Sequence, residues 1–108
     1  MIRTLADRSM VDKALGSSRA LLYKHSPLCW QSALALRQVR RFVELHPDTP
    51  VYVVDVVAQA DLSDLIARRL QVGHASPQAI LVQGGTATWS ASHLGIRAKA
   101  LSLALGGQ

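Results

Sequence analysis

The sequence predicts a single α/β domain with a mixed four-stranded sheet and an extra helix at its N-terminus. VYVVDVV (51–57) is a continuous, β-branched run, which is typical of a strand covered on both faces. Helical patterns precede and follow this run, and a β-α-β unit requires a right-handed crossover between parallel strands. Gly84-Gly85 separates two short strand-like segments, as in a tight hairpin. The hairpin adds an antiparallel edge to the parallel strands.

Length and composition favour one folded unit covering residues 1–108. Hydrophobic residues make up 49% of the chain and charged residues 18%, which is typical of a compact globule. No apolar run approaches the roughly 20 residues of a membrane span, and no stretch at the N-terminus resembles a signal peptide. A lone cysteine excludes an internal disulfide, which fits a reducing compartment. We therefore expect a cytoplasmic protein that does not bind membranes.

The net charge of +5 favours anionic partners in general but gives no sign of nucleic-acid binding. The densest basic group is Arg37, Arg40 and Arg41, and the other basic residues are scattered along the chain. Aromatic residues make up only 5% of the chain, too few for a base-stacking platform. The charges are interpreted as solvated surface.

The N-terminal half reads as helix, strand, loop and helix. Residues 3–15 form a weak amphipathic pattern that ends at Gly16, and residues 20–23 form a short buried strand. Pro27 enforces a loop, and residues 30–45 follow with a helical period. The buried face of this helix is predicted at Ser32, Leu36, Val39 and Val43.

The C-terminal half adds a helix, a hairpin and a last helix. Residues 62–70 have a helical period, with Asp61 or Ser63 as the predicted cap. The hairpin strands are predicted at 79–83 and 86–90, and Ser92 is predicted to cap the last helix. The buried stripe of that helix is predicted at Leu94, Ala98, Leu101 and Leu105.

This order of elements, β-α-β-α-β-β-α after an N-terminal helix, is the thioredoxin-like arrangement. In that fold the reactive thiol sits between the first strand and the first long helix, which is where Cys29 lies. A thiolate at a helix N-terminus is stabilised by unpaired backbone N–H groups and the helix dipole. Lys24 and His25, just upstream, would add positive potential. The alternative is an inert, buried cysteine.

Ser32 stands where a dithiol C-x-x-C enzyme carries its second cysteine. Its hydroxyl can donate a hydrogen bond to the sulfur. A C-x-x-S site can form a mixed disulfide but cannot expel the bound partner by internal attack, so a second thiol must complete the turnover. Cys29 and Ser32 are therefore the predicted catalytic residues.

The predicted substrate contacts surround the thiol. Ser76-Pro77 precedes an apolar strand and is a candidate cis peptide bond. In a thioredoxin-like fold this loop lies beside the thiol, and the backbone of Ser76 would pair with an extended substrate. Trp30 is expected as an exposed contact, and His25 and His74 flank the two loops. Each of these histidines, however, could equally be scaffold.

No metal site is expected from the four histidines. His25, His46, His74 and His93 include no pair at i,i+4, and neither cysteine nor carboxylates cluster with them in sequence. His46 reads as a helix C-terminal histidine and His93 as a structural residue after Ser92. No cofactor is expected.

Segments matching KHS, C-x-x-S, LS, IA, V-x-H-x-SPQ and W-x-x-SH make the chain resemble the monothiol bacilliredoxins, thioredoxin-like proteins of the bacillithiol system. The resemblance spans about residues 20–101 in the right order. It departs at Trp30, where the family usually has proline, at Ala60, where it often has arginine, and at Ala75, where it commonly has glutamate. The matching residues are Lys24-His25-Ser26, Cys29, Ser32, Leu62-Ser63, Ile66-Ala67, Val72, His74, Ser76-Pro77-Gln78, Trp89, Ser92-His93 and Ile96.

The resemblance implies a bacterial protein that removes bacillithiol, a low-molecular-weight thiol, from S-thiolated client proteins and carries it on Cys29. Two other functions stay open. The chain could be a non-catalytic interaction module with a vestigial or regulatory cysteine, which Trp30 encourages. Cys29 could also ligate a bridging iron–sulfur cluster, as in monothiol glutaredoxins, although those proteins resemble CGFS and this chain has CWQS.

Overall fold

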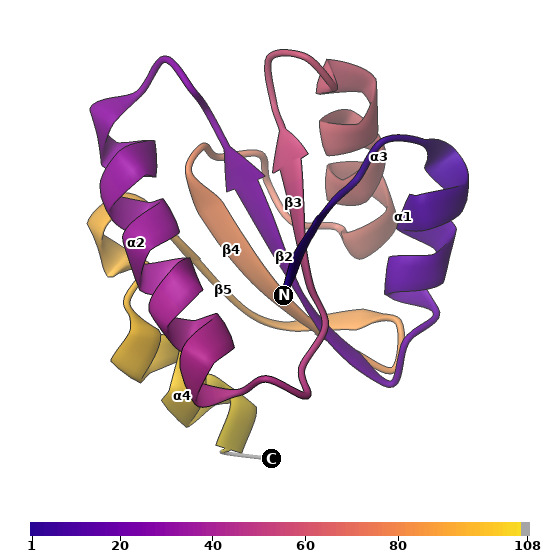
Figure 1. Ribbon diagram of the computed structural model, residues 1–108. Helices are drawn as coiled ribbons and strands as arrows, with labels where there is room; N and C mark the ends of the chain where they lie inside the picture. The colour runs from indigo at the N-terminus through magenta and orange to yellow at the C-terminus, as the bar shows by residue number, and fades with distance from the viewer. Residues whose placement is uncertain (107–108) are drawn as a thin grey trace.

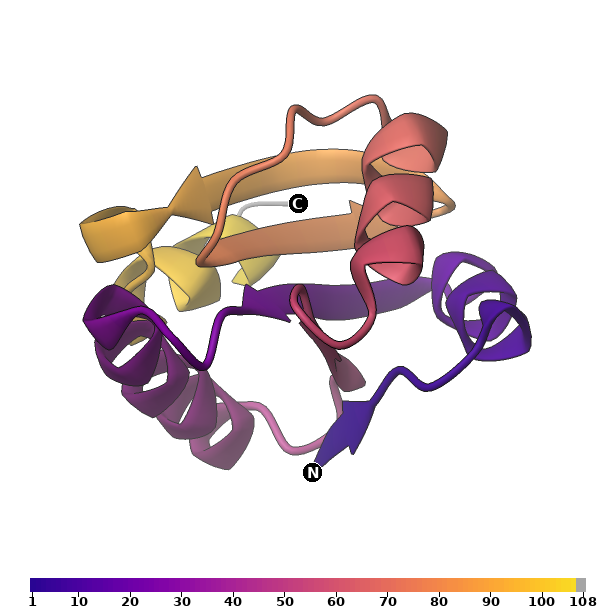
Figure 2. The ribbon, with the colours of Figure 1, turned by 90° about the horizontal axis from the view of Figure 1, so that it is seen from above.

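The computed structural model describes residues 1–106 and contains a five-stranded mixed sheet in the order β1-β3-β2-β4-β5 (Figure 1). Helices α2 and α4 cover one face of the sheet, and α1 and α3 cover the other (Figure 2). The strands are β1 (Ile2–Thr4), β2 (Arg19–His25), β3 (Val51–Asp55), β4 (Gln78–Gln83) and β5 (Thr86–Ser92). The helices are α1 (Arg8–Leu15), α2 (Trp30–Leu45), α3 (Ala60–Leu70), the short 3-10 helix η1 (His93–Gly95) and α4 (Ala98–Gly106).

The sheet joins a parallel half to an antiparallel half at β2. Strands β1, β3 and β2 run parallel, whereas β4 pairs antiparallel with both β2 and β5. The β4–β5 hairpin turns at Gly84 and Gly85, whose φ angles of 62° and 79° suit residues without a Cβ. The mixed α/β fold class and the hairpin are therefore confirmed.

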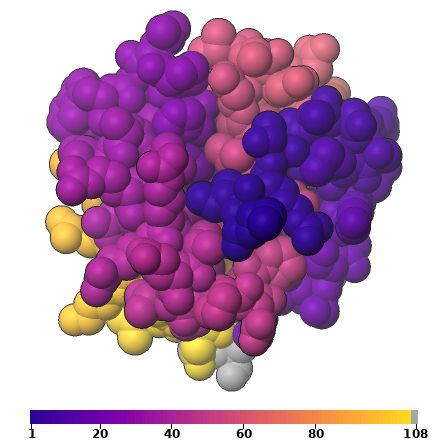
Figure 3. Space-filling model, viewed as in Figure 1, coloured from indigo at the N-terminus to yellow at the C-terminus, as the bar shows by residue number. Residues whose placement is uncertain are grey.

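The prediction of four strands was wrong by one, because residues 2–4 form β1 rather than part of a helix. Ile2 pairs with Val51 of β3, and the helix starts only at Arg8. A three-residue edge strand is too short to show a period, so its pairing with β3 decides its conformation. Figure 3 shows these N-terminal residues, in indigo, between the layer of α2 and the layer of α1 and α3.

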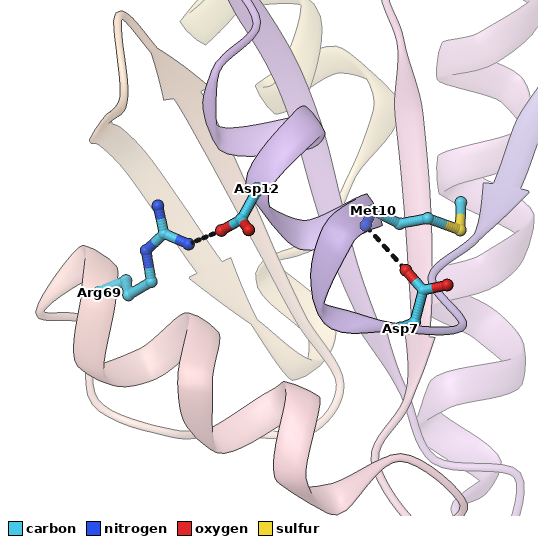
Figure 4. Close-up of polar contacts among 4 residues, drawn as sticks. All are labelled: Asp7, Met10, Asp12 and Arg69. Atoms are coloured by element: carbon cyan, nitrogen blue, oxygen red, sulfur yellow. Dashed lines mark hydrogen bonds and ion pairs between the residues drawn. The ribbon is translucent and has the colours of Figure 1, made fainter.

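Helix α1 begins at a side-chain cap and is tied to α3 by an ion pair (Figure 4). Asp7 Oδ1 accepts a hydrogen bond from the Met10 N–H at 2.9 Å. That bond, together with one from the Ser9 hydroxyl, lowers the pKa of the Asp7 carboxyl. The ion pair joins Asp12 of α1 to Arg69 of α3.

Two predicted caps were wrong. Helix α3 begins at Ala60 after Gln59, and Ser63 is a buried residue within the helix. Strand β5 extends to Ser92, and η1 then separates it from α4. Leu94 is consequently 55% exposed, although Ala98, Leu101 and Leu105 are buried as predicted.

The core consists of two apolar layers, one on each side of the sheet. The α2 side includes Ala35, Val39 and Phe42, so the buried face of α2 is rotated slightly from the predicted one, and Leu36 and Val43 are only partly buried.

Within residues 1–106, no helix is long and apolar enough to cross a membrane.

Candidate active site around Cys29

Cys29 occupies the N-cap position of α2, immediately after the loop that leaves β2. Its backbone is extended (φ −111°, ψ 123°), and its side chain caps no backbone N–H group. The loop is closed by hydrogen bonds from Cys29 N to Ser26 O (3.2 Å) and from Ser32 N to Cys29 O (3.0 Å). The residue is partly exposed. A thiol in this position lies at the positive end of the dipole of a 16-residue helix.

Ser32 is fully buried one turn into α2 and holds the loop before the cysteine. Its Oγ accepts a hydrogen bond from the Ser26 N–H at 3.1 Å. Because this bond uses only a lone pair, the hydroxyl hydrogen is left for another acceptor. Among the described residues, Ser32 makes no hydrogen bond to the Cys29 sulfur, so the predicted bond stays a prediction.

Tyr23 lies beneath the first turn of α2 and connects it to His25. The Tyr23 hydroxyl donates to the Ser32 carbonyl oxygen at 2.8 Å and lies 3.1 Å from His25 Nδ1. A phenol has one hydrogen, so His25 must donate from Nδ1, and its Nε2 is then a hydrogen-bond acceptor. Burial raises the pKa of Tyr23 to about 12, and the charge of Cys29 adds to this shift. Burial lowers the pKa of His25, which favours the neutral ring at pH 7.

A second polar cluster lies on the opposite face of the sheet, beside α3. Lys24 is fully buried, and its Nζ lies 3.3 Å from His74 Nδ1. The Ser63 hydroxyl lies 3.4 Å from the same nitrogen. An ammonium group only donates, so His74 accepts at Nδ1 and carries its proton on Nε2. Burial lowers the pKa of Lys24, and the carboxylate of Asp64 opposes this shift.

The loop between α3 and β4 is anchored around a cis peptide bond between Ser76 and Pro77. Pro77 is buried, and its carbonyl oxygen accepts from the His93 N–H at 3.0 Å. The Gln78 side chain donates to the Gly73 carbonyl at 2.9 Å. Within residues 1–106, Ser76 Oγ and Gln78 Oε1 are buried without a hydrogen-bond partner. The hydrogen bonds made by Pro77 and Gln78 hold the loop against β4 and η1.

The structure separates the four histidines. His25 belongs to the cluster with Tyr23 and His74 to the cluster with Lys24, whereas His46 ends α2 and pairs with Ser102 Oγ at 2.8 Å. His93 is exposed on η1. In the described part of the chain, no three His, Cys, Asp or Glu side chains gather closely enough to hold a metal ion.

Trp30 follows the thiol directly and is 67% exposed, as expected of a surface contact. Its neighbour on the other side, Leu28, is 85% exposed. Together they place two large apolar side chains in solvent on either side of Cys29.

Sequence reasoning missed Tyr23 as a site residue and did not place Lys24 on the opposite face of the sheet. Lys24 was expected to add positive potential at the thiol, but it points to the α3 face and is fully buried. The strand period does carry the signal, because alternation places Tyr23 and His25 on one face and Lys24 on the other. A lysine between buried strand residues is easily taken for the end of the strand.

Comparisons with known proteins place this chain in one family. The model of the family described as monothiol bacilliredoxin BrxC matches residues 2–101. A solved structure described as a candidate oxidoreductase with a thioredoxin fold is 30% identical, with a TM-score of 0.89 over 96% of this chain and 93% of that chain.

More distant solved structures show the same fold. Mitochondrial thioredoxin 3 from Saccharomyces cerevisiae, in its oxidised form, is 16% identical, with a TM-score of 0.78 over 99% of this chain and 95% of that one. Thioredoxin from Malassezia sympodialis is 12% identical, with a TM-score of 0.80 over 99% of this chain and 90% of that one. The chain therefore has the thioredoxin fold.

Proposed function

Since the chain belongs to the monothiol bacilliredoxin BrxC family, we propose that Cys29 removes bacillithiol from mixed disulfides on client proteins. Family membership and the thioredoxin fold support a thiol redox function in general. The observation that carries the specific proposal is the position of the lone cysteine. It is partly exposed at the N-cap of α2, and Ser32 stands where a second thiol would be needed for internal resolution.

The proposed reaction has two exchange steps. In the first, the Cys29 thiolate attacks the bacillithiol sulfur of the client mixed disulfide. A Cys29–bacillithiol disulfide forms, and the client leaves as a thiolate. In the second, a free low-molecular-weight thiol, as its thiolate, attacks the bacillithiol sulfur on Cys29. Cys29 is released as a thiolate, and a small-molecule disulfide is the other product.

The residues around Cys29 have distinct proposed roles. The N-terminus of α2 and the Ser32 hydroxyl stabilise the thiolate before attack and after release. His25 offers a neutral Nε2 that accepts a proton from an arriving thiol, because its Nδ1 is committed to Tyr23. His74 offers an Nε2–H donor to the substrate, because its Nδ1 is committed to Lys24.

The loop at Ser76 and Pro77 and the indole of Trp30 complete the proposed substrate site. The backbone of Ser76 would pair with the extended client segment, and Trp30 would pack against it. The predicted cytoplasmic location suits this reaction, because client thiols there are normally reduced.

A turnover assay tests the proposal. A short peptide carrying a bacillithiol mixed disulfide is incubated with the protein and excess bacillithiol, and release of the free peptide thiol is followed over time. We expect catalysed release with the wild type and none above background with Cys29→Ser. Because Ser is nearly isosteric with Cys at this partly exposed position, circular dichroism should show an unchanged fold. Catalysis that survives Cys29→Ser would overturn the proposal.

A second function, a non-catalytic interaction module, is favoured by one observation. Leu28 and Trp30 expose large apolar side chains beside the thiol, as a docking surface would. On that reading, wild type and Cys29→Ser would be equally inactive in the same assay.

A further inference from the structure

A cleft of about 320 Å³ lies between α2 and the segment that runs from η1 to the residue before α4. One wall carries Leu34 and Arg37 of α2, and the other carries His93, Leu94 and Arg97. The cleft therefore combines apolar side chains with two guanidinium groups. It is distinct from the residues around Cys29 described above.

The cleft begins at the end of the molecule that holds the thiol. Trp30 and Leu34 are four residues apart on α2 and so lie on the same face, one turn from each other. The opposite wall is fixed to the cis-proline loop, because the His93 N–H donates to the Pro77 carbonyl oxygen. A chain segment that leaves the thiol along α2 would therefore enter the cleft.

The charge of the cleft is unbalanced. None of the residues that line it is acidic. Within residues 1–106, Arg37 and Arg97 form no ion pair, and the described ion pair, Asp12–Arg69, lies in the other helical layer. The whole chain has a net charge of +5. An occupant with carboxylate groups would satisfy both guanidinium groups.

The apolar part of the surface indicates a peptide rather than a small polar molecule. Leu34 is 41% exposed and Leu94 is 55% exposed, and both line the cleft. Burying both leucines requires apolar side chains in the occupant. A segment with acidic and apolar residues supplies both kinds of contact.

We propose that this cleft binds an acidic, partly apolar segment of the client protein that adjoins the thiolated cysteine. The proposal rests on the proposed function and names the class of client that it would select. Opposite charges raise the rate of encounter, so the selection acts mainly on the association step.

Two peptides test this proposal. Each carries one cysteine as a bacillithiol mixed disulfide, followed by leucines interspersed with glutamates in one peptide and with glutamines in the other. At low ionic strength we expect the wild type to react with the glutamate peptide about tenfold faster, at the lower end of electrostatic steering. Raising the salt concentration should remove most of this preference, because the Debye length shortens.

Substitutions then locate the effect. The Arg37→Gln/Arg97→Gln variant should lose the preference and keep the wild-type rate with the glutamine peptide. The matched control, Arg8→Gln/Lys13→Gln, removes the same charge from exposed positions on α1 and should keep the preference. Equal rates for the two peptides with the wild type would overturn the proposal. An equal loss of preference in the control would also overturn it, because net charge would then explain the effect.

Further outcomes separate the possible occupants. The same peptides are also prepared as mixed disulfides with mercaptoethanol, which has no carboxylate. If the arginine substitutions matter only for the bacillithiol adducts, the cleft binds the small thiol and the proposal is wrong. If sedimentation shows a dimer that these substitutions dissociate, the cleft is a contact between copies and the proposal is also wrong. Failure of the wild type on every peptide would instead refute the proposed function.

Discussion

His25 and His74 lie on opposite faces of the sheet, and their neighbours give them opposite chemistry. His25 meets the Tyr23 hydroxyl, whose hydrogen is already donated to Ser32, so its Nδ1 donates. His74 meets the ammonium of Lys24, which has no lone pair, so its Nδ1 accepts. The ring of His25 therefore offers an acceptor at Nε2, and the ring of His74 offers a donor.

The difference follows from three consecutive residues of one strand. Side chains alternate along β2, so Tyr23 and His25 point toward α2 while Lys24 points toward α3. The two faces thus receive a hydroxyl and an amine at the same level of the sheet. A one-residue shift in the register of β2 would exchange them.

Of the changes that test this difference between the two histidines, removing the Tyr23 hydroxyl should have the largest effect. Tyr23→Phe leaves the buried Ser32 carbonyl without this donor and releases His25 Nδ1, so we expect a loss of about 1–2 kcal/mol in the free energy of unfolding. Chemical denaturation measures this loss. Tyr52→Phe is the matched control, because Tyr52 is also buried but its hydroxyl makes no hydrogen bond within residues 1–106. Equal losses in both variants would show that the hydrogen bond of Tyr23 does not contribute to the free energy of unfolding as proposed.

Replacing Lys24 should change the tautomer of His74 and leave that of His25 unchanged. Lys24→Met keeps the length of the side chain but removes the donor, so the proton of His74 should redistribute between its two nitrogens. Side-chain nitrogen chemical shifts measure the tautomer of each ring. We expect His74 to lose its preference for Nε2–H and the tautomer of His25 to be unaffected. Thiol–disulfide exchange at Cys29 should slow severalfold. An unchanged His74 spectrum would show that Lys24 does not set the tautomer.

The smallest expected effect is the pH dependence of stability that His25 contributes. The pKa of His25 in the folded protein lies below its ordinary value of about 6.5, so the unfolded chain binds more protons between these two values. The contribution of His25 to stability is therefore present above about pH 6.5 and is lost as the pH falls toward its folded pKa. We expect wild type to lose more stability than His25→Gln over this range in denaturation curves. Parallel curves for the two proteins would contradict the lowered pKa.

The sequence predicted the features of the site that depend on local spacing. Cys29 at the start of a helix, Ser32 one turn later and the loop at Pro77 all lie where the pattern of strands and helices placed them. The sequence did not predict β1, because a three-residue edge strand has no period of its own. It also did not predict that Lys24, Ser63 and His74 form a polar cluster, whose contacts join residues up to 50 positions apart. Such contacts depend on the packing of α3 against the sheet.

The most direct test of the account is the mass of the intact protein after a single round of exchange. Wild type is mixed with a bacillithiol-modified peptide in the absence of any free thiol and is then analysed by mass spectrometry with peptide mapping. The account predicts one bacillithiol on Cys29, stable until free bacillithiol is added and then lost. Unmodified protein, or an adduct that disappears without an added thiol, would contradict a monothiol mechanism at Cys29.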